Sequence, residues 1–153
     1  MNEKSCPHCG GVLGKHRSLP DHRRFFALIS AAHAQWPHDH DFKPDSVEHL
    51  RKWLITAAGH RDVVEIAVPE TEDQPALARL VALSMQSALE AAGAYAFVRP
   101  DPNGGRVAVY KPRSIAWDTI TQREFSEIRS AVEDVIEREV GVSAEDLLRE
   151  KAA

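Results

Sequence analysis

Cysteines and long hydrophobic runs are scarce in this sequence of 153 residues. It has two cysteines, too few for a disulfide framework. No segment reaches the roughly 18 apolar residues that a membrane-spanning helix needs. The first residues, Met1 to Cys6, lack the apolar segment of a secretory signal. We therefore expect a cytoplasmic protein that has no membrane partner.

Catalytic motifs are also missing. The chain contains no Gly-x-Ser-x-Gly elbow, no phosphate-binding glycine loop that ends in Lys-Ser or Lys-Thr, and no His-Glu-x-x-His. We predict no catalytic residue. An alternative is a metal-dependent nuclease that uses His22, His60 and Asp62, since imidazoles and carboxylates can bind divalent metals. The carboxylate cluster that a two-metal site needs is not evident, so this alternative ranks last.

The residues that are present have the composition of a globular protein, with 43% hydrophobic and 27% charged residues and a net charge of -4. The charge is unevenly distributed, because residues 1–61 carry +3 and residues 62–153 carry -7. All eight histidines and both cysteines lie in the first region. Groups that bind metals or phosphates are therefore concentrated toward the N-terminal end. We expect His38 and His40, in a polar loop, to face solvent.

Hydrophobic periodicity predicts an α+β fold in which helices pack on a small antiparallel sheet that includes a β-hairpin. Turn-forming residues at 101–105 separate the two strands of the hairpin. We expect one domain over residues 20–153, preceded by a separate segment at residues 1–19. Capping boxes are expected at Asp45–Glu48 and Thr121–Glu124. In chain order, the expected elements are helices at 20–36 and 45–59, a strand at 63–68, a helix at 74–92, strands at 94–99 and 106–111, and helices at 121–140 and 143–151.

The N-terminal segment contains half of a zinc signature. Cys6 and Cys9 are separated by two residues and followed by two glycines, a spacing at which two thiolates can bind one tetrahedral zinc ion. A structural site needs two further ligands; His16 is the expected third, and His22 or His8 the fourth. We predict a zinc knuckle that binds structural Zn²⁺ through Cys6, Cys9, His16 and His22. The alternative is a reduced turn without metal.

A run of cations lies before and within the first expected helix. It includes Arg17, Arg23 and Arg24. Guanidinium groups bind phosphates with two hydrogen bonds, and unpaired amides at a helix start add affinity for anions. Positive charge at a helix N-terminus opposes the helix dipole, so we predict that these arginines bind the phosphates of a nucleic acid. The alternative is a solvated basic face over a core made by Phe25 or Phe26.

The expected hairpin carries a second group of cations. Lys111 and Arg113 lie at its end, and Arg99 and Arg106 lie nearer its turn, with Tyr110 beside them. A basic two-stranded ribbon can follow a nucleic-acid backbone. Alternation places Arg106 and Tyr110 on one face and Lys111 on the other. We include Lys111 and Arg113 in the predicted nucleic-acid site, with ordinary surface charge as the alternative.

Three blocks of sequence resemble a family of phage and prophage proteins of unknown function. The first is Ser18–Ile29, with the sequence SLPDHRRFFALI. The second runs from His49–Leu54 through Ala58–Asp62, and the third is Lys111–Trp117, followed by Glu124 and Phe125. More distantly, the first two blocks are similar to the NinB (Orf) recombination-mediator family of lambda-like phages. That resemblance implies a homodimer that binds single-stranded DNA, helps to load a recombinase and has no enzymatic activity.

The leading hypothesis is a phage-encoded nucleic-acid-binding accessory protein that acts in recombination or replication in the host cell and binds single-stranded DNA. The alternative is a protein-interaction factor that binds a host recombination, defence or repair complex through its acidic C-terminal helices. The net charge of -4 suits this alternative better than it suits a dedicated DNA-binding protein, which is usually basic.

Overall fold

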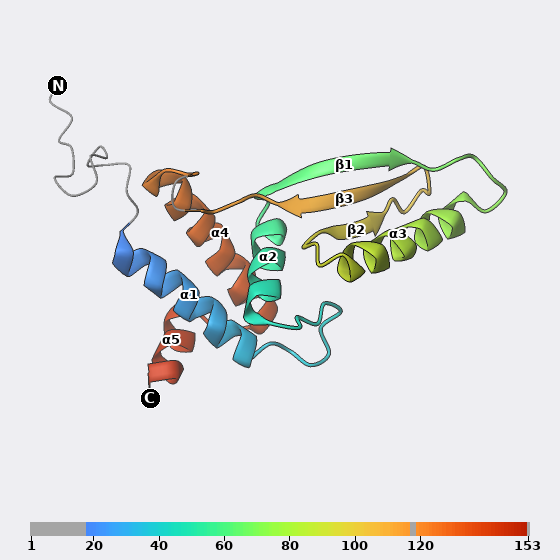
Figure 1. Cartoon of the computed structure of the whole chain (residues 1–153). Helices are drawn as coiled ribbons and strands as arrows, with labels where there is room; N and C mark the ends of the chain where they lie inside the picture. Colours follow the sequence, from blue (N-terminus) through green and yellow to red (C-terminus); the bar gives the residue numbers. More distant parts are fainter. Residues whose placement is uncertain (1–17, 117–118, 153) are drawn as a thin grey trace, which may run out of the picture. The chain divides into compact units, whose positions relative to one another are not determined.

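The computed structural model describes residues 18–116 and 119–152. Within these residues it has five helices and one antiparallel sheet of three strands (Figure 1). This confirms the α+β prediction and the expected order of elements. The predicted zinc knuckle falls mainly on residues 1–17, which lie outside the described residues. The elements are α1 (Leu19–Ala34), α2 (Val47–Ala57), β1 (Arg61–Ala67), α3 (Gln74–Ala91), β2 (Phe97–Pro100), β3 (Arg106–Pro112), α4 (Gln122–Val140) and α5 (Ala144–Ala152).

The chain divides into two compact units. Unit 1 combines residues 1–54 with residues 114–153, and unit 2 is the continuous segment 55–113. Unit 1 therefore holds α1, α4, α5 and most of α2, whereas unit 2 holds the sheet and α3. Among the described residues, no helix is both long enough and apolar enough to cross a membrane.

Unit 1 is built on α1, which contacts both α4 and α5. Ser18 caps α1, its side chain accepting a hydrogen bond from the Asp21 backbone N–H. The predicted capping box at Thr121 is confirmed at the start of α4, and the Thr121 backbone N–H lowers the pKa of Glu124. The apolar residues of α1 and α4 meet in the core, where the rings of Phe25 and Phe125 lie 5.4 Å apart, edge to face. The fully buried core side chains of these two helices include Phe25, Leu28, Ile29, Phe125, Val132 and Ile136.

The expected capping box at the start of α2 is wrong by one residue. The side chain of Ser46, and not that of Asp45, accepts the hydrogen bond from the His49 backbone N–H at 3.1 Å. Glu48 does not complete a box. Its carboxylate instead accepts two hydrogen bonds from the Arg51 guanidinium, which lowers the pKa of Glu48.

The loop between α1 and α2 folds over an aromatic cluster. His40 lies between Trp36 and Trp53, with ring centroids at 4.8 and 5.4 Å. Its Nδ1 accepts a hydrogen bond from the Phe42 backbone N–H at 2.9 Å, and its Nε2 lies 3.2 Å from a Glu139 oxygen. His38 is exposed as expected, but the expectation that His40 faces solvent is wrong, because only 17% of its side chain is accessible.

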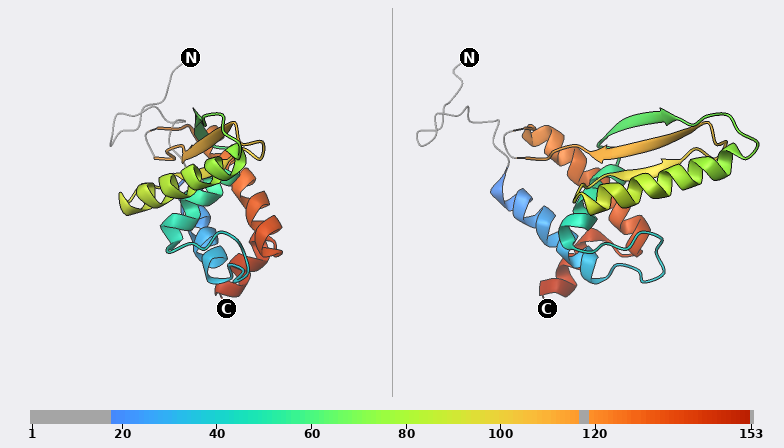
Figure 2. Two further views of the ribbon diagram at one scale, coloured as in Figure 1. Left: turned by 90° about the vertical axis from the view of Figure 1, so that its right-hand side faces the viewer. Right: turned by 45° about the vertical axis from the view of Figure 1, so that its right-hand side comes forward.

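Unit 2 consists of the sheet, in the order β1-β3-β2, and one helix that packs on it. Helix α3 lies along one face, against β2 and β3 (Figure 2). Small buried alanines allow this close approach, since Ala78 and Ala82 meet Val107 of β3. Ala-rich and Leu-rich positions at helical spacing thus predicted α3 correctly, and alternation predicted the strands.

The hairpin loop is held against the start of α3. Gly104 is buried and has a φ of +83°, a left-handed conformation that favours glycine. A Cβ at this position would lie 2.6 Å from the Pro75 nitrogen. A side chain at position 104 would therefore force the loop and the helix apart.

Candidate nucleic-acid interface

Within unit 2, the face of the sheet opposite α3 carries a set of aromatic and cationic side chains. The antiparallel register places Tyr110 of β3 between Val63 of β1 and Phe97 of β2. Directly opposed residues of neighbouring strands point to the same face, so Phe97 and Tyr110 lie side by side on it. By the same alternation the face also includes Arg61, Glu65, Arg99, Arg106 and Ala108.

Tyr110 forms a cation–π contact with Arg61. The centre of the Arg61 guanidinium lies 4.4 Å from the centroid of the Tyr110 ring. One nitrogen of the same guanidinium donates a hydrogen bond to the Thr56 backbone carbonyl at 3.2 Å. These two contacts fix a positive charge beside the aromatic ring without neutralising it.

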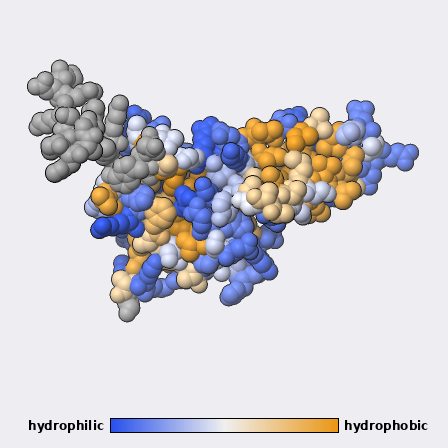
Figure 3. Space-filling model, in the orientation of Figure 1, coloured by the Kyte–Doolittle hydropathy of each residue, from blue (hydrophilic) through white to orange (hydrophobic). Residues whose placement is uncertain are grey.

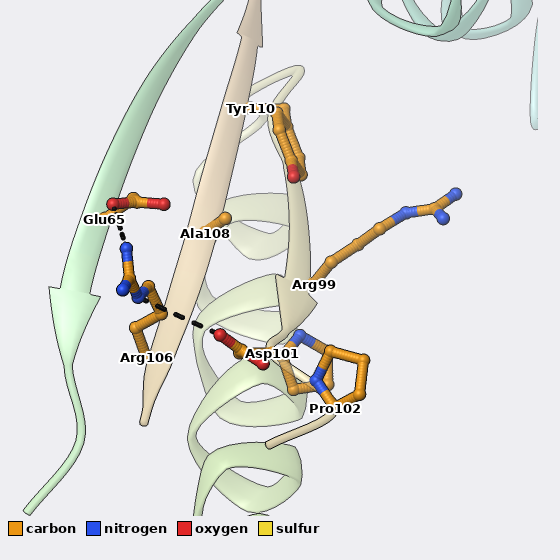
Figure 4. Close-up of a pocket in the computed structure, with 8 residues that line it drawn as sticks. Glu65, Arg99, Asp101, Pro102, Arg106, Ala108 and Tyr110 are labelled. Atoms are coloured by element: carbon orange, nitrogen blue, oxygen red, sulfur yellow. Dashed lines mark hydrogen bonds and ion pairs between the residues drawn. The ribbon is translucent and has the colours of Figure 1, made fainter. Parts of the chain in front are cut away.

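A hollow of about 440 Å³ lies on this face, lined by residues of all three strands and of the hairpin loop. At one side Arg106 is paired, with one nitrogen 2.9 Å from Glu65 and another 3.8 Å from Asp101. At the other side Arg99 extends away from the sheet (Figure 4). It is exposed and has no ion pair among the described residues. Arg99 is thus available for an external anion, whereas Arg106 is not.

This arrangement combines two functions that a single-stranded nucleic acid requires of its binding site. Aromatic rings on an open sheet can stack on unpaired bases, which is worth about 1–3 kcal/mol for each base. Guanidinium groups beside the rings can bind the phosphates that join those bases. The hollow between Tyr110 and Arg99 brings both functions within one site.

The two cations that we predicted on the hairpin lie elsewhere. Lys111 alternates with Tyr110 and belongs to the face on which α3 packs. Arg113 donates a hydrogen bond to Asp62 at 3.0 Å, in an exposed ion pair. Lys111 therefore lies off the open face, and the charge of Arg113 is partly neutralised.

The predicted arginines of the first helix divide between described and undescribed residues. Arg17 lies outside the described residues. Arg23 and Arg24 belong to α1 in unit 1, are exposed, and have no ion pair within residues 18–116 and 119–152. They are available for an external partner, but they belong to a different unit from Tyr110 and Arg99. Phe25 is part of the core, as predicted by the alternative in which this segment is a solvated basic face over a phenylalanine core.

Of the predicted zinc ligands, only His22 is described, while Cys6, Cys9 and His16 are not. The His22 ring packs against Phe26 at 4.7 Å and lies 6.1 Å from Phe125. The part of the chain that the structure describes contains no group of three or more His, Cys, Asp or Glu side chains that could bind a metal ion.

Sequence reasoning missed two members of the open face, Arg61 and Phe97. Alternation within the hairpin correctly placed Arg106 with Tyr110. It could not show that β1 would pair with β3, which brings Arg61 to Tyr110 across 49 positions of sequence. A signal was present, since Phe97 and Arg99 are two residues apart in one expected strand, a spacing that places both side chains on the same face.

No protein-family model, curated protein or solved structure matches this chain.

Proposed function

We propose that this protein is a nucleic-acid-binding accessory protein of phage recombination or replication, and that it binds single-stranded DNA on the open face of its sheet. The observation that carries the proposal is the adjacency of Phe97, Tyr110 and the stacked Arg61 on a face that α3 leaves open. The exposed Arg99 supports it, because its charge is not paired within the described residues.

The electrostatics of this face imply a moderate dependence on salt. Within a single copy of the chain, two guanidinium groups, Arg61 and Arg99, can reach phosphates without breaking an ion pair to a described residue. Single-stranded DNA loses about 0.7 units of logarithmic affinity per logarithmic unit of salt for each phosphate neutralised. Two contacts predict a slope of roughly -1.4. Stacking on Phe97 and Tyr110 supplies the remaining affinity, which does not depend on salt.

The test is fluorescence anisotropy with a labelled oligothymidine at several salt concentrations. Tyr110→Leu keeps an apolar side chain but removes the stacking ring, and we expect binding to weaken by roughly tenfold. Arg99→Ala should weaken binding and make the salt slope less negative by about 0.7. Phe97→Leu should resemble Tyr110→Leu.

Arg79→Ala is the matched control. Arg79 is an exposed arginine of the same unit, but it lies on α3 and not on the open face. The Arg79→Ala variant should bind the oligothymidine as tightly as the unsubstituted protein does. A double variant, Arg23→Ala with Arg24→Ala, tests the cations of α1. If that variant lost binding while Tyr110→Leu and Arg99→Ala kept it, the open face would not be the site. Absence of binding at low salt would refute the function itself.

A further inference from the structure

The outer edge of β1 is an unpaired strand edge. Within residues 18–116 and 119–152, β1 is a terminal strand of the sheet and pairs with β3 only. Its residues from Asp62 to Ala67 are all exposed, including Val63 at 48% and Val64 at 61%. Figure 3 shows that hydrophobic residues gather on the surface of this unit. A long β-branched edge strand of this kind is a ready template for another strand.

Two hydrogen bonds beyond the ends of β1 show which backbone groups face outward. The Arg113 N–H donates to the His60 carbonyl at 2.9 Å, and the Val68 N–H donates to the Gly105 carbonyl at 3.1 Å. Even-numbered residues of β1 therefore make the hydrogen-bonded pairs with β3, because these pairs alternate along an antiparallel ladder. The N–H and C=O groups of Val63, Glu65 and Ala67 point away from β3. They make no bond in the ladder with β3, and no other backbone or side-chain group of the described residues bonds to them.

The opposite edge of the same sheet is closed. The Asp101 N–H donates to the Arg106 carbonyl, so odd-numbered residues of β2 make the hydrogen-bonded pairs with β3. The backbone groups of Val98 and Pro100 therefore point away from β3. The Val98 N–H donates to the Gln86 side chain at 2.8 Å. Pro100 has no N–H at all. Within the described residues, β1 is thus the edge at which a further strand can add.

We propose that β1 pairs antiparallel with β1 of a second copy of this chain. The two copies are then related by a two-fold axis perpendicular to the sheet. Directly opposed residues of the two β1 strands therefore have side chains on the same side of the extended sheet. Charge complementarity selects this occupant. When the axis passes through Val63, Arg61 lies directly opposite Glu65 of the second copy, and Glu65 lies opposite its Arg61. Val63 then faces Val63, a favourable cross-strand pair.

Neighbouring registers are less favourable. An axis through Glu65 would place two carboxylates directly opposite each other, which is destabilising. An axis through Val64 would pair Glu65 with Val63 and Arg61 with Ala67, so both direct ion pairs would be lost. Glu65 already contacts Arg106, but 54% of its side chain is exposed, which leaves room for a second cation. Charge therefore fixes the register as well as the partner.

The test is the mass of the purified protein without nucleic acid, measured by sedimentation velocity over roughly 1–100 µM, since dimer population depends on concentration. We expect a dimer whose dissociation constant rises at least tenfold in Arg61→Glu and in Glu65→Arg. The double variant, Arg61→Glu with Glu65→Arg, should restore the dissociation constant to within about threefold, because it recreates both pairs with reversed sign. Failure of this rescue would overturn the Val63 register.

Val63→Pro provides a second, independent measurement. It removes an outward N–H and no hydrogen bond to β3, so the fold should persist while the dimer is lost. Circular dichroism melting verifies that each variant is folded. A monomer in the unsubstituted protein, or a dimer that survives Val63→Pro unchanged, would overturn the proposal. Because no nucleic acid is present, these outcomes are separate from those of the DNA-binding test.

Discussion

The two edges of the sheet in unit 2 differ in how far they are protected from pairing with a further strand. β2 has four residues, a proline at an outward position, and a glutamine side chain that occupies its remaining outward N–H. β1 has seven residues, of which six are exposed, and none of the residues that the structure describes covers its edge in this way. Short length, proline and covering side chains are the means by which proteins protect edge strands from pairing. Among the described residues these features are found on the β2 edge and not on the β1 edge, which is the edge at which we propose that a second copy pairs.

Among the substitutions that test this comparison, Val64→Pro should cause the largest loss of stability. Val64 is one residue from Val63, but its N–H faces β3 and bonds within the sheet. Proline there removes a ladder hydrogen bond and leaves the Val109 carbonyl unsatisfied, so we expect a loss of about 3 kcal/mol in stability. Val63→Pro should cost less than about 1 kcal/mol. Urea unfolding followed by circular dichroism measures both. Equal losses would mean that the assigned alternation of β1 is incorrect.

Gln86→Ala should uncover the protected edge. The Gln86 side chain accepts from Val98 N–H and donates to the Ala96 carbonyl at 3.1 Å. We expect a stability loss of about 1–2 kcal/mol from these lost hydrogen bonds. With both edges open, pairing no longer closes on itself, and assemblies larger than a dimer should form at high concentration. Light scattering detects them. Ser87→Ala, at the exposed neighbouring position, should show neither change.

Pro100→Ala should have the smallest effect. The substitution restores an outward N–H on β2 without removing a hydrogen bond, and it loses the restriction that proline places on the unfolded chain, about 0.4–1 kcal/mol. Amide hydrogen exchange gives the sharper measurement. The new amide at position 100 should exchange rapidly, as should the outward amides of Val63 and Glu65 under monomeric conditions, whereas the amides of Val64 and Ile66 should be protected.

Local patterns in the sequence were sufficient for most of the fold. The helical spacing of Phe25, Leu28 and Ile29 predicted the buried face of α1. Alternation in the hairpin predicted that Val107 and Tyr110 lie on opposite faces, and Val107 is the one buried beneath α3. Errors arose where two local options were equally good, as at Asp45 and Ser46, both of which are common capping residues.

The candidate site was less predictable because it depends on contacts between distant segments. The approach of Arg61 to Tyr110 follows from the pairing of β1 with β3, which neither segment encodes by itself. For the same reason the environment of His40 was wrongly predicted. Its polar neighbours in sequence suggested solvent, but Trp36 and Trp53 surround it. The run of cations at the start of α1 favoured Arg23 and Arg24, whereas Arg99 was recognised among the hairpin cations but was not included in the predicted site.

The close approach of Gly104 to Pro75 constrains how this protein can change over evolution. The proline nitrogen carries no hydrogen, so the glycine backbone can lie against it without depriving a donor of its acceptor. One position further on, a Cβ at Gly105 would meet nothing within 4 Å. Substitutions and insertions in the hairpin should therefore accumulate at 105 and be purged at 104, and any lineage that replaces Gly104 should show a compensating change in the first turn of α3.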